Sequence, residues 1–148
     1  MALRRIVVGV DGSDNAAVAV AWAASLAAAT GAEVVAVHAL GLLDHLGPGD
    51  PVLAQPHRDE IGLEFEKAWC APLDEPGVAC RKVMRDGPPA DVLLAEADEV
   101  GADLIVVGSR GVGTVAELVL GSTSTQVARR STRPVTIVPI GVRPRPAG

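Results

Sequence analysis

Four small residues late in the chain have types and spacing suited to holding a phosphate. The pattern is G-x2-G-x9-G-S, formed by Gly108, Gly111, Gly121 and Ser122. It follows an apolar run, 104–107, of the kind expected for a buried strand. Glycines at a strand end let backbone amides approach a ligand, and a helix N-terminus beyond them favours anions. The spacing therefore predicts an anion site, and the obvious anion is a phosphate.

The first apolar run of the chain ends in a related way. It leads into Gly9, Val10, Asp11, Gly12 and Ser13. Ligands of open parallel sheets bind outside the carboxyl ends of the strands, where the winding direction reverses. If the two runs are neighbouring strands, both loops overlook one crevice.

Short apolar runs alternate with stretches of helical period along the chain, which indicates an α/β domain. The expected strands are residues 5–10, 33–39, 78–84, 103–107 and 134–138. The expected helices run from a cap at Ser13 or Asp14 to Gly31, and over 59–71, 90–100 and 122–130. Right-handed crossovers then place helices on both faces of an open, twisted parallel sheet, a three-layer arrangement.

Two segments stand outside this pattern. Residues 41–58 are rich in Gly, Pro and Asp and predict a long loop that could act as a lid. A chain of 148 residues, 49% of them hydrophobic, is the size of one domain. We expect that domain to span 1–141 and the remainder, 142–148, to be a flexible tail.

The net charge of −5 conceals an asymmetry, because five arginines and no acid follow Leu118. We interpret Arg129 and Arg130 as charges at a helix C-terminus rather than as ligand contacts. Few aromatic residues and no basic repeat argue against a nucleic-acid partner. No apolar run is long enough to span a bilayer, and no signal peptide is recognisable, so we expect a cytoplasmic protein without a membrane partner.

The cysteines and histidines have no metal-site spacing. Cys70 and Cys80 are ten residues apart and fit neither a redox C-x-x-C pair nor a zinc pattern, so we interpret them as buried reduced thiols. His38 is interpreted as a packed strand residue. Trp22 and Trp69 are interpreted as core anchors rather than base-stacking platforms. No structural metal is expected.

Other phosphate motifs fit less well. A Walker loop requires a lysine beside the glycines, and the only lysines are Lys67 and Lys82. Residues 111–116 match the loose dinucleotide pattern G-x-G-x-x-A, but no acidic residue follows Glu117 to bind a ribose. Flavin binding remains open on fold logic, although the chain offers few rings to stack on the isoalloxazine.

Each motif residue also has a purely structural interpretation. Asp11 with Ser13 would serve as an N-terminal helix cap. Gly111 and Gly113 would be turn glycines, and Ser122 a helix cap. The joint spacing is what favours a binding function.

The chain as a whole resembles the universal stress protein family, specifically its ATP-binding branch. The resemblance is carried by the opening IVVGVDGS at 6–13, by VHA at 37–39, by DGP at 86–88 and by the glycine pattern at 108–122. It implies a five-stranded sheet in the order 3-2-1-4-5, like that of the adenine nucleotide alpha hydrolases. It also implies a bound adenine nucleotide and a homodimer formed through the last strand, Val135–Val138.

Carried onto this sequence, the resemblance implies a specific set of nucleotide contacts. The Asp11 carboxylate would lie on the ribose hydroxyls or near a metal such as Mg²⁺, and the main chain of Ala39 would meet the adenine edge. Arg110 would approach the phosphates, and Thr123 would help to hold the phosphate tail. The full set of expected ATP-binding residues is Gly9, Val10, Asp11, Ser13, Ala39, Val107, Gly108, Arg110, Gly111, Gly113, Gly121, Ser122 and Thr123.

The main functional hypothesis is an ATP-binding regulatory protein of the stress response with at most slow ATP hydrolysis. Near the phosphates the sequence offers only hydroxyls, Arg110 and the distant Asp11 to activate a water, so no catalytic residue is expected. The alternatives are a metal-assisted nucleotide hydrolase or phosphotransferase that uses Asp11 and Arg110, and an interaction module that binds no nucleotide. The complete glycine pattern argues against the last of these.

Overall fold

Five parallel strands form one sheet, and the order β3-β2-β1-β4-β5 confirms the predicted topology. The computed structural model describes residues 2–40, 55–110 and 120–143, with the backbone alone at 55–57. The strands are β1 (Arg5–Gly9), β2 (Glu33–Ala39), β3 (Ala79–Arg85), β4 (Leu104–Gly108) and β5 (Val135–Val138). The α-helices are α1 (Asp14–Thr30), α2 (Gln55–Glu64), α3 (Pro89–Val100) and α4 (Ser122–Arg130).

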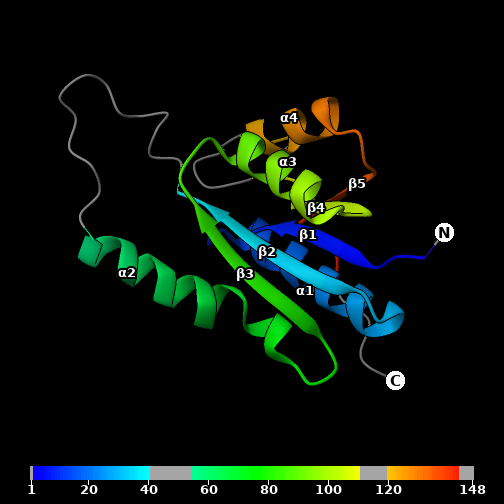
Figure 1. Ribbon diagram of the computed structural model, residues 1–148, viewed down its shortest axis with the longest axis horizontal. Coiled ribbons are helices and arrows are strands. Elements are labelled where there is room, and N and C mark those ends of the chain that lie inside the picture. The colour runs from blue at the N-terminus through cyan, green and yellow to red at the C-terminus, as the bar shows by residue number, and fades with distance from the viewer. Residues whose placement is uncertain (1, 41–54, 111–119, 144–148) are drawn as a thin grey trace.

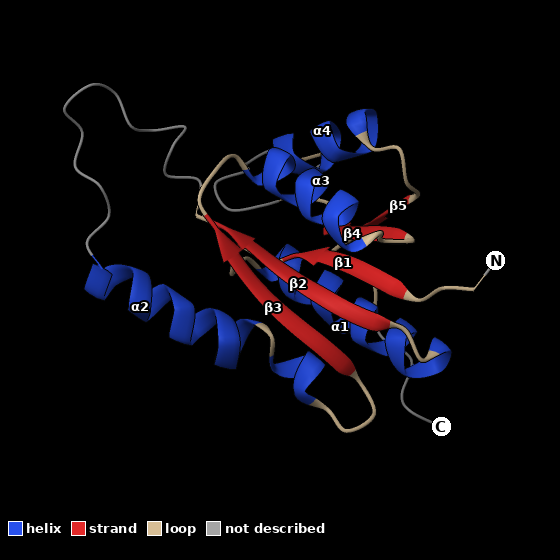
Figure 2. Ribbon diagram, viewed as in Figure 1, coloured by secondary structure: helices blue, strands red, loops and turns tan. Residues whose placement is uncertain are grey.

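The sheet forms the middle of three layers, with α1 on one face and α3 with α4 on the other (Figures 1 and 2). The central strands are apolar on both faces because helices cover both. In β1, Ile6 and Val8 join the core on the α1 side, whereas Val7 joins the core on the α3–α4 side, and all three are fully buried. The alternation of side chains along each strand therefore builds two cores.

Helix α1 packs on the sheet through small residues. Its buried positions are Ala16, Ala19, Val20, Ala23, Ala24 and Ala27. The larger Val18, Trp22 and Leu26, which recur every four residues in the sequence, are only partly buried and border that face. The helix ends at Gly31, whose φ of 76° is left-handed and whose N–H donates to the Ala27 carbonyl at 2.8 Å. Alanines bring the helix backbone close to the strands.

Helix α1 approaches the sheet closely at Gly108. A Cβ added to Gly108 would lie 2.7 Å from the Asn15 carbonyl oxygen and 3.1 Å from the Ala16 nitrogen. Both atoms belong to backbone and cannot swing aside as a flexible side chain would. Glycine is therefore required at the end of β4 for helix packing.

The second helical segment differs from its prediction at both ends. Helix α2 starts at Gln55, inside the stretch expected to be a loop, because Pro56 is tolerated in the first turn of a helix. It ends at Glu64 rather than at residue 71, and a π-helical turn (Phe65–Trp69) and a 3₁₀ turn (Ala71–Asp74) follow. The helix runs beside the edge strand β3 (Figure 1), where the Arg58 guanidinium lies 2.7 Å from the Asp86 carboxylate.

The strand predicted at 78–84 is found one residue later, and it is an edge strand as predicted. Residues 41–54 and 144–148 lie outside the described residues. Most of the expected loop (41–58), which was proposed as a lid, and most of the expected tail (142–148) fall in these two segments. Val142, assigned to the tail, packs against the α1-side core. None of the described helices is long and apolar enough to cross a membrane.

Arg130 forms an ion pair between two helices, and both cysteines are at least partly buried. Arg130 lies in the last turn of α4 and pairs with Asp91 of α3 at 2.7 Å, which confirms its interpretation as a helix-terminal charge. Cys70 and Cys80 are unpaired thiols. Cys70 is fully buried and Cys80 partly so, and burial raises the pKa of Cys70 to about 12.

Asp103 joins the start of β4 to the start of β1. Its Oδ2 accepts hydrogen bonds from the backbone N–H groups of Arg4 (2.9 Å) and Arg5 (3.1 Å). Its own N–H donates to the Arg5 carbonyl at 2.9 Å. These backbone donors hold the pKa of the Asp103 carboxyl below its ordinary value.

The first prediction concerns this carboxylate. A lowered pKa in the folded state means that its stabilisation is complete above the unfolded pKa, about 3.9, and is lost as the pH falls through the folded value. Asp103→Asn is expected to be less stable than the parent at pH 7, with the difference shrinking between about pH 5 and pH 2. Urea unfolding across this range measures it, and a difference that stays constant with pH would contradict the assignment.

The second prediction compares two glycines. Gly108→Ala is expected to lower the free energy of unfolding by about 2–3 kcal/mol, because the added methyl meets the α1 backbone. The control is Gly62→Ala in α2, where the nearest atom, Met84 Cε, would be 3.7 Å away. That change is expected to raise the free energy by about 0.5–1 kcal/mol through helix propensity. Denaturant unfolding of both proteins measures the contrast, and equal effects at the two sites would refute it.

Candidate functional site

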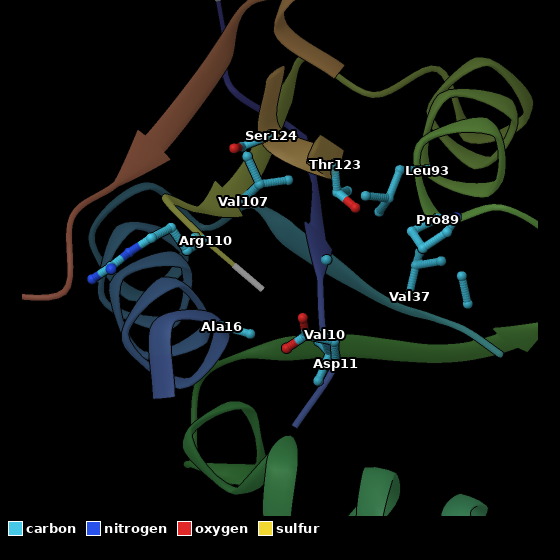
Figure 3. Close-up of a pocket in the computed structure, with 13 residues that line it drawn as sticks. Val10, Asp11, Ala16, Val37, Pro89, Leu93, Val107, Arg110, Thr123 and Ser124 are labelled. Carbon is cyan, nitrogen blue, oxygen red and sulfur yellow. The ribbon is translucent and has the colours of Figure 1, made fainter. Parts of the chain in front are cut away.

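A hollow opens at the carboxyl ends of β1, β2 and β4, between the N-terminal turns of α1, α3 and α4. Its volume is about 520 Å³, including open solvent at its mouth. The lining residues, drawn in Figure 3, are Gly9, Val10, Asp11, Ala16, Val37, Ala39, Pro89, Leu93, Val107, Gly108, Arg110, Thr123 and Ser124. Segments distant in sequence thus meet where a parallel sheet binds ligands.

Most of the residues expected from the sequence lie in this lining. Eight of them do: Gly9, Val10, Asp11, Ala39, Val107, Gly108, Arg110 and Thr123. Three described residues of the expected set, Ser13, Gly121 and Ser122, do not line the hollow. Gly111 and Gly113 lie outside the described residues.

Five lining residues were not expected, namely Ala16, Val37, Pro89, Leu93 and Ser124. Periodicity could have found some of them. Val37 shares a strand face with Ala39, since side chains alternate along β2. Leu93 follows Pro89 by one helical turn and so shares its face of α3. No pattern in the sequence distinguishes Ser124 from the adjacent hydroxyl residues.

The turn after β1 combines a helix cap with a carboxylate. Ser13 is the N-cap of α1, and its Oγ accepts a hydrogen bond from the Ala16 N–H at 3.2 Å. Asp11 Oδ1 in turn accepts hydrogen bonds from the Ser13 N–H and hydroxyl. The structural interpretation of Ser13 is confirmed. Asp11 both supports the cap and lines the hollow.

The two strand-ending glycines have different surroundings. A Cβ at Gly9 would point toward Leu93 (3.1 Å) and Val107 (3.6 Å), which line the hollow. A Cβ at Gly108 would instead meet the α1 backbone. At Gly9 the missing side chain leaves room in the hollow, as expected from the sequence. At Gly108 a side chain is excluded by the packing of α1 instead.

Hydrogen bonds attach the start of α4 to Ser109, the residue after β4, which in turn bonds to α1. The Gly121 N–H donates to the Ser109 carbonyl at 2.8 Å, and the buried Ser124 hydroxyl lies 3.1 Å from that oxygen and 3.0 Å from the Gly121 carbonyl. The Ser109 hydroxyl donates to Asn15 Oδ1 of α1 at 2.9 Å. Gly121 is the N-cap of α4, and Ser122, its first residue, is exposed. Gly121 therefore has a structural role beside any contact with a ligand.

The lining separates into apolar and polar parts. Val37, Pro89 and Leu93 lie together on one side of the hollow, whereas Arg110 lies on the opposite side with its guanidinium directed outward (Figure 3). The hydroxyls of Thr123 and Ser124 belong to the start of α4. Helix N-termini carry partial positive charge. Such an arrangement suits a ligand with a flat apolar body and an anionic end.

His38, between the lining residues of β2, is a packed residue as predicted. It is 8% exposed, and its Nδ1 donates to the Val10 carbonyl at 2.7 Å. Its ring lies against Phe65 and Trp69. The imidazole therefore belongs to the core on the α1 side.

Comparison with known proteins agrees with this architecture. The model of the universal stress protein family (Usp) matches residues 2–139. The universal stress protein YxiE of Bacillus subtilis (strain 168) is 36% identical over 145 residues, which cover 90% of this chain and 97% of that protein. A universal stress protein of Thermus aquaticus is 35% identical over 137 residues, covering 91% of this chain and 98% of that protein.

Solved structures give the same result. The crystal structure of a universal stress protein in complex with cAMP superposes with a TM-score of 0.71 at 34% identity, covering 95% of this chain and 100% of that one. A protein of the universal stress protein family from Burkholderia pseudomallei gives 0.73 at 27% identity, with coverages of 93% and 96%. The fold, the extent of the family match and the identity to these relatives agree, and the chain belongs to the universal stress protein family.

Proposed function

We propose that this protein binds an adenine nucleotide, ATP, in the hollow and acts as a nucleotide-dependent regulatory protein of the stress response. The observation that carries the proposal is the convergence of three strand ends and three helix N-termini on one hollow with an apolar and a polar side. The 34% identical universal stress protein whose structure contains cAMP supports an adenine nucleotide as the ligand class.

The two sides of the lining suggest how the nucleotide lies. The adenine ring would fit the apolar side formed by Val37, Pro89 and Leu93, with the Ala39 main chain at its edge. The Asp11 carboxylate would accept hydrogen bonds from the ribose hydroxyls. The phosphates would point toward Thr123 and the first N–H groups of α4, where partial positive charge favours anions. Gly111, Gly113 and Ser122 stay in the proposal as further phosphate contacts.

The donor set also fits a magnesium ion. Mg²⁺ is usually held by one or two carboxylates together with phosphate oxygens and waters. Asp11 is the single acidic residue among the described lining residues. As the alternative to its contact with the ribose, Asp11 would hold the ion, which would neutralise charge on the phosphates.

We propose binding with at most slow hydrolysis. A general base must accept a proton from the attacking water. The candidate among the described lining residues is the Asp11 carboxylate, one of whose oxygens already accepts two hydrogen bonds from Ser13. A regulatory role needs only that the nucleotide bind one conformation or assembly of the protein better than another.

We also propose a cytoplasmic homodimer. The strand β5 is an edge of the sheet, and Val135 and Ile137 on it are only partly buried. Edge strands with unpaired backbone groups are templates for a second copy. The two unpaired thiols support a reducing compartment. Light scattering measures the mass, and a monomer at every concentration would exclude the dimer.

The third prediction tests the hollow with two matched alanines. Ala39→Trp fills the hollow from the partly exposed end of β2, whereas Ala79→Trp places the same ring at the exposed start of β3, at the other end of the sheet. Titration calorimetry of ATP with Mg²⁺ is expected to show one site per chain in the parent and in Ala79→Trp. Ala39→Trp is expected to weaken binding at least 100-fold.

Three results would count against this proposal. Unchanged affinity in Ala39→Trp would remove the ligand from the hollow, and the absence of heat in the parent would refute ATP binding. Sustained phosphate release that Asp11→Ala abolishes would favour a hydrolase instead. Urea unfolding of each variant verifies that the fold is retained.

A further inference from the structure

A cluster of three rings lies behind the hollow, on the α1 side of the sheet. This aromatic cluster consists of His38 from β2 and Phe65 and Trp69 from the π-helical turn. The His38 ring centroid is 5.1 Å from that of Trp69, in an edge-to-face arrangement, and 5.8 Å from that of Phe65. Side chains alternate along β2, so His38 points away from the hollow that Val37 and Ala39 line.

The π-helical turn is what presents two aromatic residues to His38. The Cys70 N–H donates to the Phe65 carbonyl, five residues earlier, at 3.1 Å. Such turns are rare in proteins, and those that occur are often found at functional sites. Lys82 of β3 holds the turn in place, because its Nζ donates to the Glu66 carbonyl at 2.9 Å and to the Asp74 carboxylate at 2.8 Å. The two rings are therefore fixed to the sheet.

The aromatic cluster contacts the turn that follows β1. His38 Nδ1 donates to the Val10 carbonyl at 2.7 Å. Gly12 has a φ of 81°, and a Cβ there would lie 2.6 Å from Trp69 Cζ2 and 2.7 Å from Cε2. The backbone of the turn thus rests directly on the indole. Any residue other than glycine at position 12 would collide with it.

The other side of the same turn lines the hollow through Val10 and Asp11. One short segment therefore has the aromatic cluster on one side and the ligand site on the other. We propose that Trp69 and His38 are positioning residues, which hold residues 10–12 so that Asp11 is already placed for the ligand. This inference rests on the proposed nucleotide binding.

The physical effect is preorganisation. A turn that is ordered before the ligand arrives does not lose conformational freedom on binding. The apparent dissociation constant is the intrinsic one divided by the fraction of molecules in which the turn is in place, so a smaller fraction means weaker binding. Removing the indole leaves Gly12, the most permissive residue, without its support. Removing the Trp69 side chain is therefore expected to lower the affinity for the nucleotide as well as the stability of the fold.

The fourth prediction compares the two tryptophans of the chain. Trp69→Leu is expected to weaken ATP binding about tenfold. Trp22→Leu, at a partly buried position on α1, is expected to lower stability and leave the dissociation constant within about twofold. His38→Leu is expected to resemble Trp69→Leu, whereas His38→Asn, which keeps a donor for the Val10 carbonyl, recovers most of the affinity.

A double-mutant cycle separates positioning from general destabilisation. If the aromatic cluster acts through Asp11, then Trp69→Leu has little further effect on binding in an Asp11→Ala background. Additive effects of the two substitutions would overturn the proposal, as would a Trp69→Leu protein that is destabilised but binds ATP like the parent.

A readout without ligand keeps this inference distinct from the proposed function. The Val10 N–H donates to the Val37 carbonyl at 2.9 Å, and its hydrogen exchange reports how firmly the turn is held. Exchange at Val10 and Gly12 is expected to accelerate in Trp69→Leu more than in Trp22→Leu. Equal exchange in both variants refutes positioning by the aromatic cluster. The absence of ATP binding in the parent would refute the proposed function and, with it, the role of this turn in nucleotide affinity.

Discussion

The position of β1 between β2 and β4 is the constraint on which the rest of the structure depends. The chain passes from β1 through α1 on one face of the sheet to β2, and reaches β4 through α3 on the other face. Because the two connections lie on opposite faces, the carboxyl ends of β1 and β4 are left open between them. The pairing of Val8 with Val106 then places Gly9 and Gly108 at the same edge.

This arrangement gives the two faces of the sheet different roles at the carboxyl edge. On the α3–α4 face, the missing side chain of Gly9 leaves space beside Leu93 and Val107. On the α1 face, there is close packing: Gly108 meets the α1 backbone, and Gly12 meets the indole of Trp69. The backbone at this edge thus lines the hollow on one face and is tightly packed on the other.

Much of the fold was predictable because its strands are short apolar runs separated by turn residues. The strand order itself came from resemblance to a family, since periodicity alone does not fix which strands are neighbours. The boundaries of α2 were predicted wrongly at both ends. Pro56 permits an earlier start, and the change from α to π hydrogen bonding after Glu64 leaves no mark in the apolar spacing of Ile61, Phe65 and Trp69.

The residues that line the hollow show the same division. Those at strand ends were predicted, because Gly and Asp are conspicuous after an apolar run. Apolar lining residues such as Val37 and Leu93 were not, since they are indistinguishable in sequence from ordinary core residues. The packing role of Gly108 could not be foreseen, because it depends on how closely an alanine-rich helix approaches the strand.

Amide chemical shifts of ¹⁵N-labelled protein locate bound ATP most directly. Binding in the hollow predicts large shifts at Gly9, Asp11, Ala39, Arg110 and Thr123, all at the carboxyl edge. The opposite end of the sheet provides an internal control, because a second hollow there is lined by Arg5, Gly31, Glu33 and Asp103. The amide signals of the residues that line this second hollow are predicted not to shift. Shifts confined to this second hollow, with none at the carboxyl edge, would contradict ATP binding between β1 and β4.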